Sequence, residues 1–401
     1  MKLQTDPPLH LTYCLNVHPG ESWAENYDAI RTRARAVRDR VLHGMERVPF
    51  GLGLRLGAEA AAELARPEAL ADLRAYLDDH GLYVFTVNGF PYGRFHGAGV
   101  KADVYRPDWR QPERLDYTRQ LADILAELLP EGAAGSISTV PGSYKPWLAA
   151  DADGADRVAE RLADAAAHLA ELERRTGREI VLALEPEPDC MIETTDEALD
   201  LFAGPLAEAM RSRLESAHGL GSADAADALR RHLGVCLDTA HAAVEFEEPA
   251  KALEQFASSG VRVGKVQLSA ALRLRPTPAA LERLGEFDED VYLHQVRARA
   301  GDGSVRAYAD LPEALAAGAD DADAEWRCHF HVPLFHDGDA EFGSTNDLLL
   351  GPLADLLTAG ATQHVEIETY TWGVLPDDLR PADVAAGIAA EYEWVLERML
   401  G

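Results

Sequence analysis

The sequence predicts a TIM (β/α)8 barrel, an α/β fold in which eight parallel strands alternate with helices. Three observations lead to this prediction. Eight short, mainly apolar runs of strand character recur along the chain, most of them separated by segments with a helical pattern. Such alternation favours right-handed crossovers and a parallel sheet. Several strand runs also end in polar residues, at the place where this kind of barrel presents its active site.

The eight predicted strands cover residues 11–18, 51–56, 82–88, 135–140, 179–185, 235–241, 263–269 and 364–370. Proline or glycine follows several of them, as Pro19-Gly20 follows the first and Pro186 the fifth. Helical patterns cover residues 24–41, 67–80, 116–129, 151–176, 195–202, 206–232 and 381–400. The long helix over 151–176 is rich in alanine and is expected to end at Gly177. Alanine-rich helices fit an outer ring that packs close to the strands.

Two segments interrupt the alternation. Residues 94–112 form a long loop rich in aromatic and charged side chains, and loops of this length in compact domains tend to be functional. After the seventh strand, residues 270–325 are too long for one connection, and residues 326–334 form an additional strand-like run. No linker or solenoid repeat divides the chain. We therefore expect one domain over residues 1–401, with an insertion at about 270–345 between strands seven and eight.

Composition narrows the class of function. The chain has 401 residues, is 47% hydrophobic and carries a formal charge of −30, which repels nucleic acid and anionic membranes. None of its four cysteines forms a CxxC pair, which indicates buried, reduced thiols. The first ten residues lack a signal-peptide pattern, and no apolar run approaches the roughly 20 residues that span a bilayer. These features predict a cytoplasmic protein with a small-molecule substrate, without nucleic-acid binding or membrane insertion.

The sixth predicted strand carries the main chemical signal. It ends in Asp238, and His241 follows in the next turn. A strand tip that delivers an acid and an imidazole in this way is how a parallel barrel presents metal ligands. In the alternative reading, Asp238 caps the next helix and His241 lies in the first turn of that helix. Polar residues at the other strand ends favour the metal-ligand reading.

The polar residues at the predicted strand ends are Asn16, His18, Asn88, Glu185, Asp238 with His241, Gln267, and Glu366 with Glu368. A barrel brings such residues together at one mouth, where buried carboxylates repel one another unless a cation is present. Carboxylate oxygen with imidazole nitrogen suits Mn²⁺, Zn²⁺, Co²⁺ or Fe²⁺. The sequence therefore predicts a divalent-metal site.

Several of these residues keep a structural alternative. Glu185 precedes a proline and could be a turn residue, and Gln267 could bond only a neighbouring backbone group. Glu366 and Glu368 share one face of their strand, so one of them could support the other. His329 and His331 also share a face and could be ordinary histidines at the edge of the core. Likewise, Tyr370 and Trp372 could belong to the core or could form the apolar wall of a substrate pocket.

Three segments resemble the xylose isomerase-like TIM barrels, a superfamily that includes sugar isomerases, epimerases and an AP endonuclease branch. They are Leu-Ala-Leu-Glu at 182–185, Val-Cys-Leu-Asp-Thr-Ala-His at 235–241 and Glu-Ile-Glu-Thr at 366–369. The resemblance implies the metal ligands Glu185, Asp238, Gln267 and Glu368, with His241 nearby. Gln267 stands where the superfamily commonly has His, so His331 from the insertion could supply the missing imidazole. The acidic surface argues against the endonuclease branch.

More closely, the chain is similar to the EboE family, described as metabolite-traffic proteins. The resemblance covers most of the chain and is carried by His-Leu-Thr-Tyr-Cys-x-Asn-x-His-Pro-Gly-Glu-Ser-Trp at 10–23 and Glu-Thr-Tyr-Thr-Trp at 368–372. It implies a role in a secondary-metabolite pathway, with other pathway proteins as possible partners, and says little about chemistry.

The leading functional hypothesis is a metal-dependent isomerase or epimerase acting on a small hydroxylated or carbonyl metabolite. Its metal would hold two adjacent substrate oxygens, while Glu185 and Glu368 exchange a proton with the carbon between them. The residues expected to contact the substrate are Asn16, His18, Asn88, Tyr370 and Trp372. Two alternatives stay open: a non-catalytic barrel that binds and hands over a metabolite, and a metal-assisted hydrolase or oxidase, which a multinuclear cluster with His241 and His331 would favour.

Overall fold

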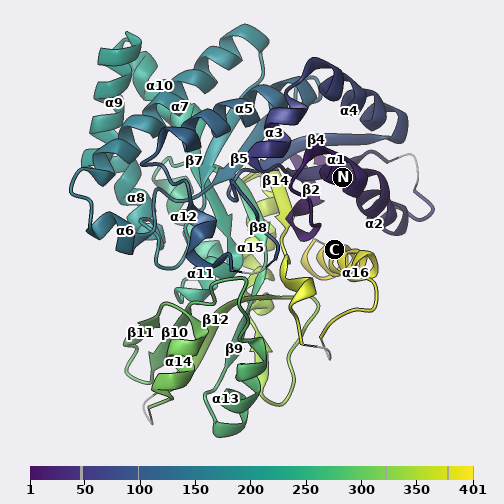
Figure 1. The fold of residues 1–401 in the computed structure, drawn as a ribbon, viewed down its shortest axis with the longest axis vertical. Helices are drawn as coiled ribbons and strands as arrows, with labels where there is room; N and C mark the ends of the chain where they lie inside the picture. The colour runs from purple at the N-terminus through teal and green to yellow at the C-terminus, as the bar shows by residue number, and fades with distance from the viewer. Residues whose placement is uncertain (46–47, 98, 321–322, 377–378, 401) are drawn as a thin grey trace.

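The computed structural model describes residues 1–45, 48–97, 99–320, 323–376 and 379–400. Its larger sheet has the strand order β1-β2-β14-β8-β7-β6-β5-β4-β3 (Figure 1). Neighbouring strands from β2 through to β3 run parallel and match the eight predicted strands. They are β2 (Pro8–Tyr13), β3 (Phe50–Arg55), β4 (Leu82–Asn88), β5 (Gly135–Thr139), β6 (Ile180–Leu184), β7 (Leu233–Asp238), β8 (Val263–Leu268) and β14 (His364–Ile367). The predicted TIM-barrel fold is confirmed.

The barrel comes together between β2 and β3 through the parallel bridge from Cys14 to Gly53. The short strand β1 (Lys2–Thr5), which the sequence did not predict, pairs antiparallel with β2. Gly53 is required by close packing, because a Cβ there would lie 1.9 Å from the Glu366 carboxylate oxygen Oε1 and 3.0 Å from the Tyr13 carbonyl. The glycine therefore leaves room for a buried glutamate inside the barrel.

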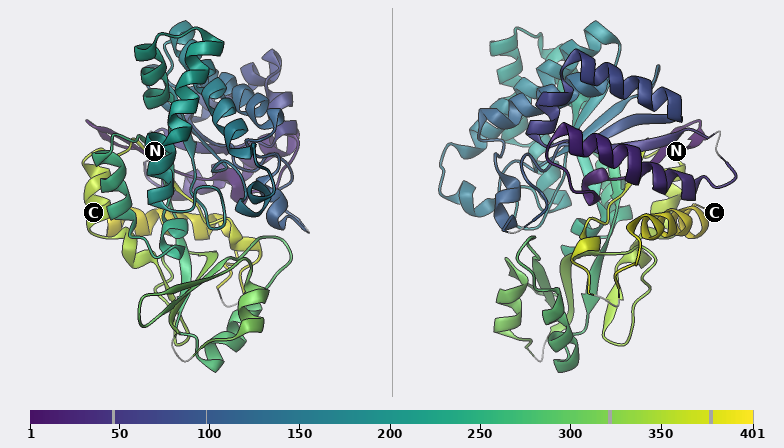
Figure 2. Two further views of the ribbon diagram at one scale, coloured as in Figure 1. Left: turned by 90° about the vertical axis from the view of Figure 1, so that its left-hand side faces the viewer. Right: turned by 45° about the vertical axis from the view of Figure 1, so that its right-hand side comes forward.

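Helices surround the strands (Figures 1 and 2). The barrel helices are α1 (Trp23–Ala29), continued by π-helical η2 (Ile30–Ala34) into α2 (Arg35–Val41), then α3 (Ala58–Leu64), α4 (Pro67–His80), α5 (Pro112–Leu128), α6 (Lys145–Ala149), α7 (Gly154–Thr176), α8 (Thr195–Ala203), α9 (Pro205–His218), α10 (Ser222–His232), α11 (Thr239–Val244), α12 (Pro249–Ser258), α15 (Pro352–Thr358) and α16 (Val384–Trp394) with η7 (Val395–Met399). As predicted, α7 ends at Gly177, whose φ of 70° is the left-handed conformation that glycine adopts easily. The buried face of α7 is largely alanine and leucine, so this helix packs closely on its neighbours.

The segment between β8 and β14 builds a second, antiparallel sheet with the order β11-β10-β12-β9-β13. It contains β9 (Ala270–Leu274), α13 (Pro278–Leu284), η4 (Gly285–Phe287), β10 (Val296–Ala300), β11 (Val305–Tyr308), α14 (Leu311–Ala317), β12 (Asp323–Val332), β13 (Phe342–Ser344) and η5 (Asn346–Leu349). This sheet forms a lobe at one end of the barrel in all three views (Figures 1 and 2). Only Ser269 separates β8 from β9, so the sheet starts directly at the carboxyl end of a barrel strand.

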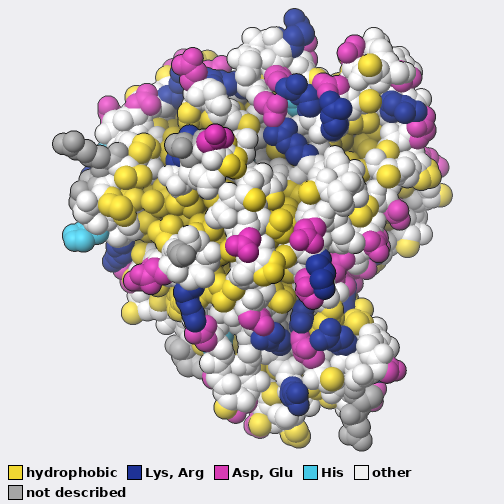
Figure 3. All heavy atoms as spheres, turned by 180° about the vertical axis from the view of Figure 1, so that it is seen from behind, with side chains coloured by type: hydrophobic (Ala, Val, Ile, Leu, Met, Phe, Trp, Pro, Cys, Tyr) yellow, Lys and Arg dark blue, Asp and Glu magenta, His cyan; other side chains and the backbone are white. Residues whose placement is uncertain are grey.

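The interior of the barrel holds charge as well as apolar side chains. Lys265 of β8 and Glu366 of β14 form an ion pair in which both side chains are fully buried. The outer surface is mixed: acidic side chains alternate with Lys and Arg, and hydrophobic side chains gather across the middle of the face seen in Figure 3. All four cysteines are free and buried, as predicted. Among the described helices, none is both long and apolar enough to cross a membrane.

The first predicted strand is too long. It was expected to reach residue 18, with Asn16 and His18 on one face, but β2 ends at Tyr13 and the chain turns into the 3₁₀ helix η1 (Leu15–Val17). In a strand, every second side chain points to the same face, and this alternation ends where the backbone turns into a helix. Asn16 and His18 consequently point to different places.

Candidate functional site

Three buried carboxylates stand at the carboxyl ends of barrel strands. Glu185 follows β6, Asp238 ends β7 and Glu368 follows β14, and each is at most 4% exposed. One oxygen of each carboxylate (Glu185 Oε2, Asp238 Oδ2 and Glu368 Oε2) has no hydrogen-bond partner among the residues that the structure describes. Buried polar atoms in folded proteins nearly always have one, so these oxygens indicate a place for a bound group.

Asp238 is held in position by its own helix. Its Oδ1 atom accepts hydrogen bonds from the Ala240 N–H at 2.8 Å, the His241 N–H at 3.0 Å and the Ser269 hydroxyl at 2.6 Å. Asp238 is thus the N-cap of α11, as the alternative reading proposed. The cap uses only Oδ1 and fixes the side chain with Oδ2 bare, so capping and ligand binding are compatible.

Glu368 is held by two amides. The Nδ2 atoms of Asn16 and Asn88 donate to its Oε1 at 2.6 Å and 3.1 Å. Asn16 lies in η1 and Asn88 ends β4, so both come from neighbouring parts of the barrel mouth. These bonds orient the carboxylate and leave Oε2 without a partner.

Three buried histidines adjoin the carboxylates, and the protein holds each one through Nδ1. The Nδ1 atom of His241 bonds the Pro186 carbonyl at 2.9 Å. The Nδ1 atom of His329 bonds the Gln295 side-chain oxygen at 2.7 Å, and that of His331 bonds the Glu368 carbonyl at 2.7 Å. These oxygens only accept hydrogen bonds, so each Nδ1 carries a proton, which leaves Nε2 as the ring atom that can face a metal. The Nε2 atoms of His329 and His331 have no partner.

The histidines and carboxylates form two overlapping groups of ligand atoms. One group is Glu185, Asp238 and His241, the other is His241, His329 and His331, and within each group the ligand atoms lie within 4.8 Å of one another. His329 and His331 come from β12 of the insertion, where a register shift in the pairing with β9 falls between Cys328 and His331. The insertion therefore contributes two imidazoles to a site that the barrel strands begin.

The electrostatics of the site favour a positively charged ligand. Burial, together with the nearby Glu368 and Asp238, raises the pKa of Glu185 well above its usual range. Burial also raises the pKa of Glu368, with Asp238 and Glu366 adding to the effect. Burial lowers the pKa of His331 to about 4 and holds that of His329 well below its usual range, so both rings are neutral at pH 7. Neutral imidazoles and buried carboxylates that repel one another are suitable ligands for a divalent cation.

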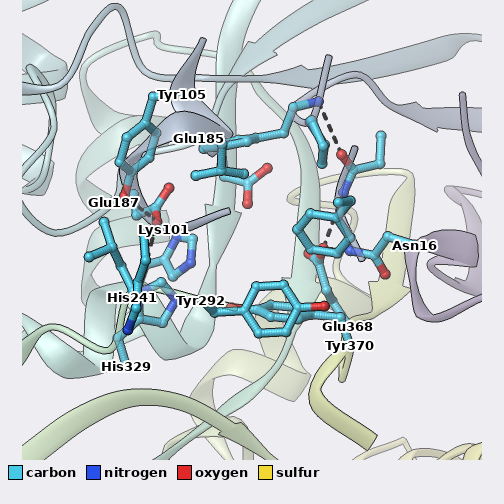
Figure 4. A pocket seen from close by; sticks show the side chains of 16 residues that line it. Asn16, Lys101, Tyr105, Glu185, Glu187, His241, Tyr292, His329, Glu368 and Tyr370 are labelled. Carbon is cyan, nitrogen blue, oxygen red and sulfur yellow. Dashed lines mark hydrogen bonds and ion pairs between the residues drawn. The ribbon is translucent and has the colours of Figure 1, made fainter. Parts of the chain in front are cut away.

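A pocket opens in front of these groups. In Figure 4, Glu187, His241 and His329 lie on one side, Asn16 and Glu368 lie on the other, and Glu185 stands between them. Glu187 accepts a hydrogen bond from the Tyr105 hydroxyl at 2.8 Å, and burial raises its pKa to about 7.

Sequence reasoning missed several pocket residues. Glu187, Tyr105, Lys101 and Tyr292 all line the pocket, as does His329, whose role the sequence left open. The Glu-Pro-Glu spacing at 185–187 was a usable signal for Glu187. The prediction that loop 94–112 is functional pointed to the right segment, which contains η3 (Lys101–Tyr105), but to no particular side chain.

Three predicted site residues have other surroundings. The Gln267 side-chain oxygen, the atom that would bind a metal, accepts a hydrogen bond from the Cys236 thiol at 2.8 Å. His18 bonds the Tyr13 hydroxyl at 2.9 Å. His18 and Trp372 line a neighbouring groove, whereas Asn16, Asn88 and Tyr370 line the pocket itself.

The donors present fit a divalent metal. Glu185, Asp238 and Glu368 offer bare carboxylate oxygens, and His241, His329 and His331 offer imidazole nitrogens. Asp238, Glu368 and the three histidines are each oriented by a hydrogen bond to their other side-chain atom, as is usual around protein metal sites. Mixed oxygen and nitrogen donors suit Zn²⁺, Mn²⁺, Co²⁺ or Fe²⁺.

No protein-family model and no curated protein matches the sequence. Solved structures do match it. The probable 3-DHS dehydratase AsbF from Bacillus anthracis has 14% identity and a TM-score of 0.48, covering 97% of this chain and 100% of the other. The IOLI protein with a binding zinc atom has 11% identity and a TM-score of 0.47, covering 96% and 97%. A xylose isomerase domain protein from Alicyclobacillus acidocaldarius subsp. acidocaldarius has 13% identity and a TM-score of 0.47, covering 98% of each chain. Function is therefore argued from the site itself.

Proposed function

We propose that this protein is a divalent-metal-dependent enzyme that isomerises or epimerises a small hydroxylated or carbonyl metabolite. The observation that carries the proposal is the group Glu185, Asp238 and His241, whose ligand atoms lie within 4.8 Å of one another, with the bare Glu368 Oε2 belonging to a residue that lines the same pocket. When bound, a metal would polarise the substrate's oxygens and offset the negative charge that develops on them. Glu185, Asp238, His241 and Glu368 are the proposed ligands.

The remaining chemistry belongs to the protein's own side chains. Glu185 follows β6 and Glu368 follows β14, two strands that β7 and β8 separate, so a substrate carbon between the carboxylates can lose a proton to one and regain it from the other. Asn16 and Asn88 keep Glu368 oriented through Oε1. The aromatic walls and the depth of the pocket exclude water from the exchanging proton.

A second candidate is metal-assisted hydrolysis or oxidation. It is favoured by the group His241, His329 and His331, which supplies imidazoles for another metal position beside the carboxylates. Adjacent metal ions are typical of hydrolytic centres. Metal analysis of purified protein separates the two, because one equivalent per chain favours isomerisation and two or more favour hydrolysis or oxidation.

The resemblance to the EboE metabolite-traffic family belongs to this proposal. It is supported by the positions of its two segments: Asn16 lies in the first, and Glu368 and Tyr370 lie in the second. These three residues line the same pocket. A metabolite handled in such a pathway would be the substrate or, in the carrier alternative, the cargo.

Proton exchange tests the proposal without knowledge of the product. The metal-loaded protein is incubated in D₂O with a panel of ketohexoses, aldopentoses and inososes, and loss of C–H signals is followed by NMR. We expect metal-dependent exchange beside the carbonyl, reduced at least about 100-fold in Glu185→Gln and Glu368→Gln. Glu393→Gln, at an exposed position of α16, is the control. Binding of a panel member without exchange would contradict catalysis and favour the carrier.

A further inference from the structure

A second hollow, here called the outer groove, adjoins the pocket. Tyr292 and Tyr370 line both hollows. Their rings pack against each other with centroids 5.0 Å apart, and Phe95 packs on both at 5.3 and 5.4 Å. Figure 4 shows Tyr292 and Tyr370 side by side at the edge of the pocket. This aromatic cluster is therefore a wall that the pocket and the outer groove share.

The walls of the outer groove are mainly apolar. Val17 of η1, Val291 before β10, Trp372 and Val374 in and after η6 (Thr371–Gly373), and Ala385 of α16 contribute to them. Several of these side chains are only partly buried, so they present apolar surface to whatever enters. Burying such surface is favourable at about 25 cal/mol per Å².

The polar groups of the groove are largely engaged with the protein. His18 bonds the Tyr13 hydroxyl, and His96 uses one ring nitrogen on the Asn16 carbonyl and the other on the Tyr292 hydroxyl. Arg40 pairs with Asp383, and both side chains are about half exposed. Arg33 is also exposed. Contacts within the groove are therefore apolar, with charge confined to exposed side chains.

We propose that the outer groove binds an apolar substituent, alkyl or aryl, of a substrate whose hydroxylated or carbonyl head occupies the pocket. The assignment of the polar head to the pocket rests on the proposed function. The contact between the apolar substituent and the groove requires no metal. The substrate class is thus a conjugate of a small polar head with an apolar tail. A free sugar would leave the groove empty.

A chain-length series tests this assignment. Methyl, butyl, hexyl and octyl β-D-glucosides, each below its micelle concentration, are titrated calorimetrically into the full-length protein, first in EDTA and then with Zn²⁺ or Mn²⁺. We expect affinity to rise by up to about fourfold per methylene, the equivalent of about 0.8 kcal/mol. Ala385→Trp should fill the groove and abolish the dependence. Ala386→Trp is the matched control, because Ala386 is an exposed neighbour on the same helix that does not line the groove.

A second variant, Val374→Asp, keeps the test valid if the tryptophan disturbs α16. It places a charge on the groove wall and should remove the chain-length dependence without filling the space. An increase of affinity with alkyl chain length that persists in EDTA supports the groove assignment even if metal-dependent proton exchange is not observed. The two proposals can therefore fail separately. Equal affinity for methyl and octyl glucoside in wild type would overturn the assignment. So would octyl sulfate binding more tightly than octyl glucoside and losing that advantage in Arg33→Ala, because the groove would then select anions.

Discussion

Asn16 and Glu368 lie 352 positions apart, and the Nδ2 atom of Asn16 donates to Oε1 of Glu368 at 2.6 Å. Asn16 follows β2 and Glu368 follows β14, two strands that pair in parallel, so the bond adds a side-chain link between them at the barrel mouth. It also orients the carboxylate with Oε2 bare. One hydrogen bond thus both links two neighbouring strand ends and orients a proposed metal ligand.

Asn16→Ala should therefore weaken metal binding while the fold is retained. Residues that orient metal ligands typically contribute 10- to 100-fold to affinity, so a loss of about that size is expected. Competition of Zn²⁺ or Mn²⁺ with a chromogenic chelator measures it. Asn26→Ala is the control, because the Asn26 amide donates only to the Gly20 and Ser22 carbonyls. Unchanged affinity in Asn16→Ala would show that this bond does not orient a ligand.

The buried ion pair inside the barrel gives a prediction about stability. Lys265→Met leaves Glu366 as an uncompensated buried carboxylate, which should cost about 3–5 kcal/mol in the free energy of unfolding. The double variant Lys265→Met/Glu366→Gln should recover part of that loss. Lys251→Met breaks an exposed pair with Glu248 and should cost at most about 1 kcal/mol. Urea unfolding compares all of these, and equal losses for Lys265→Met and Lys251→Met would contradict the account.

Glu391 on α16 predicts a pH dependence away from the site. It is 1% exposed, accepts hydrogen bonds from the Thr369 hydroxyl and the Leu334 N–H, and burial raises its pKa to about 8. Between the unfolded pKa near 4.5 and this value, the folded state keeps a proton that the unfolded state has lost. Its contribution to stability therefore falls as pH rises through that range.

Glu391→Gln keeps the acceptor and does not titrate, so its stability relative to wild type should increase from pH 5 to pH 8. The expected change is about 1.4 kcal/mol for each unit of pKa shift. Urea unfolding at several pH values measures it, with Glu393→Gln as the exposed control. A stability difference that stays constant with pH would show that Glu391 is ionised in the folded protein throughout.

The fold was predictable because the alternation of strands and helices can be recognised in short sequence runs of strand or helix character. Asp238, Glu185 and Glu368 were also predictable as strand-end residues, because the fold brings parallel strand ends to one mouth. The positions of His329 and His331 were harder to derive, since they depend on how a second sheet docks against the barrel. That docking is a tertiary contact without a local signature.

His18 and Gln267 illustrate a different limit. Alternation along a strand put Asn16 and His18 on one face, but the backbone turns after Tyr13 and separates them. Gln267 lies inside the barrel as alternation implies, yet its oxygen bonds the Cys236 thiol. Packing across strands decides which neighbouring group forms a hydrogen bond with a buried side-chain amide.

The most direct test of the metal site is thermal unfolding with and without Mn²⁺ or Zn²⁺ for wild type, Asp238→Ala and Glu368→Ala, with Glu254→Ala as an exposed control. Metal that binds the folded state adds about 2.7 kcal/mol when its free concentration is 100 times the dissociation constant. Wild type and Glu254→Ala should therefore shift upward, and the two site variants should shift much less. Without metal, Glu368→Ala should stay close to wild type in stability, because relief of carboxylate repulsion offsets the two lost amide hydrogen bonds. Asp238→Ala removes the N-cap of α11 and should lose about 0.5–2 kcal/mol in the free energy of unfolding. Equal shifts in all four proteins, or no shift in wild type, would contradict the claim that these carboxylates form a metal site.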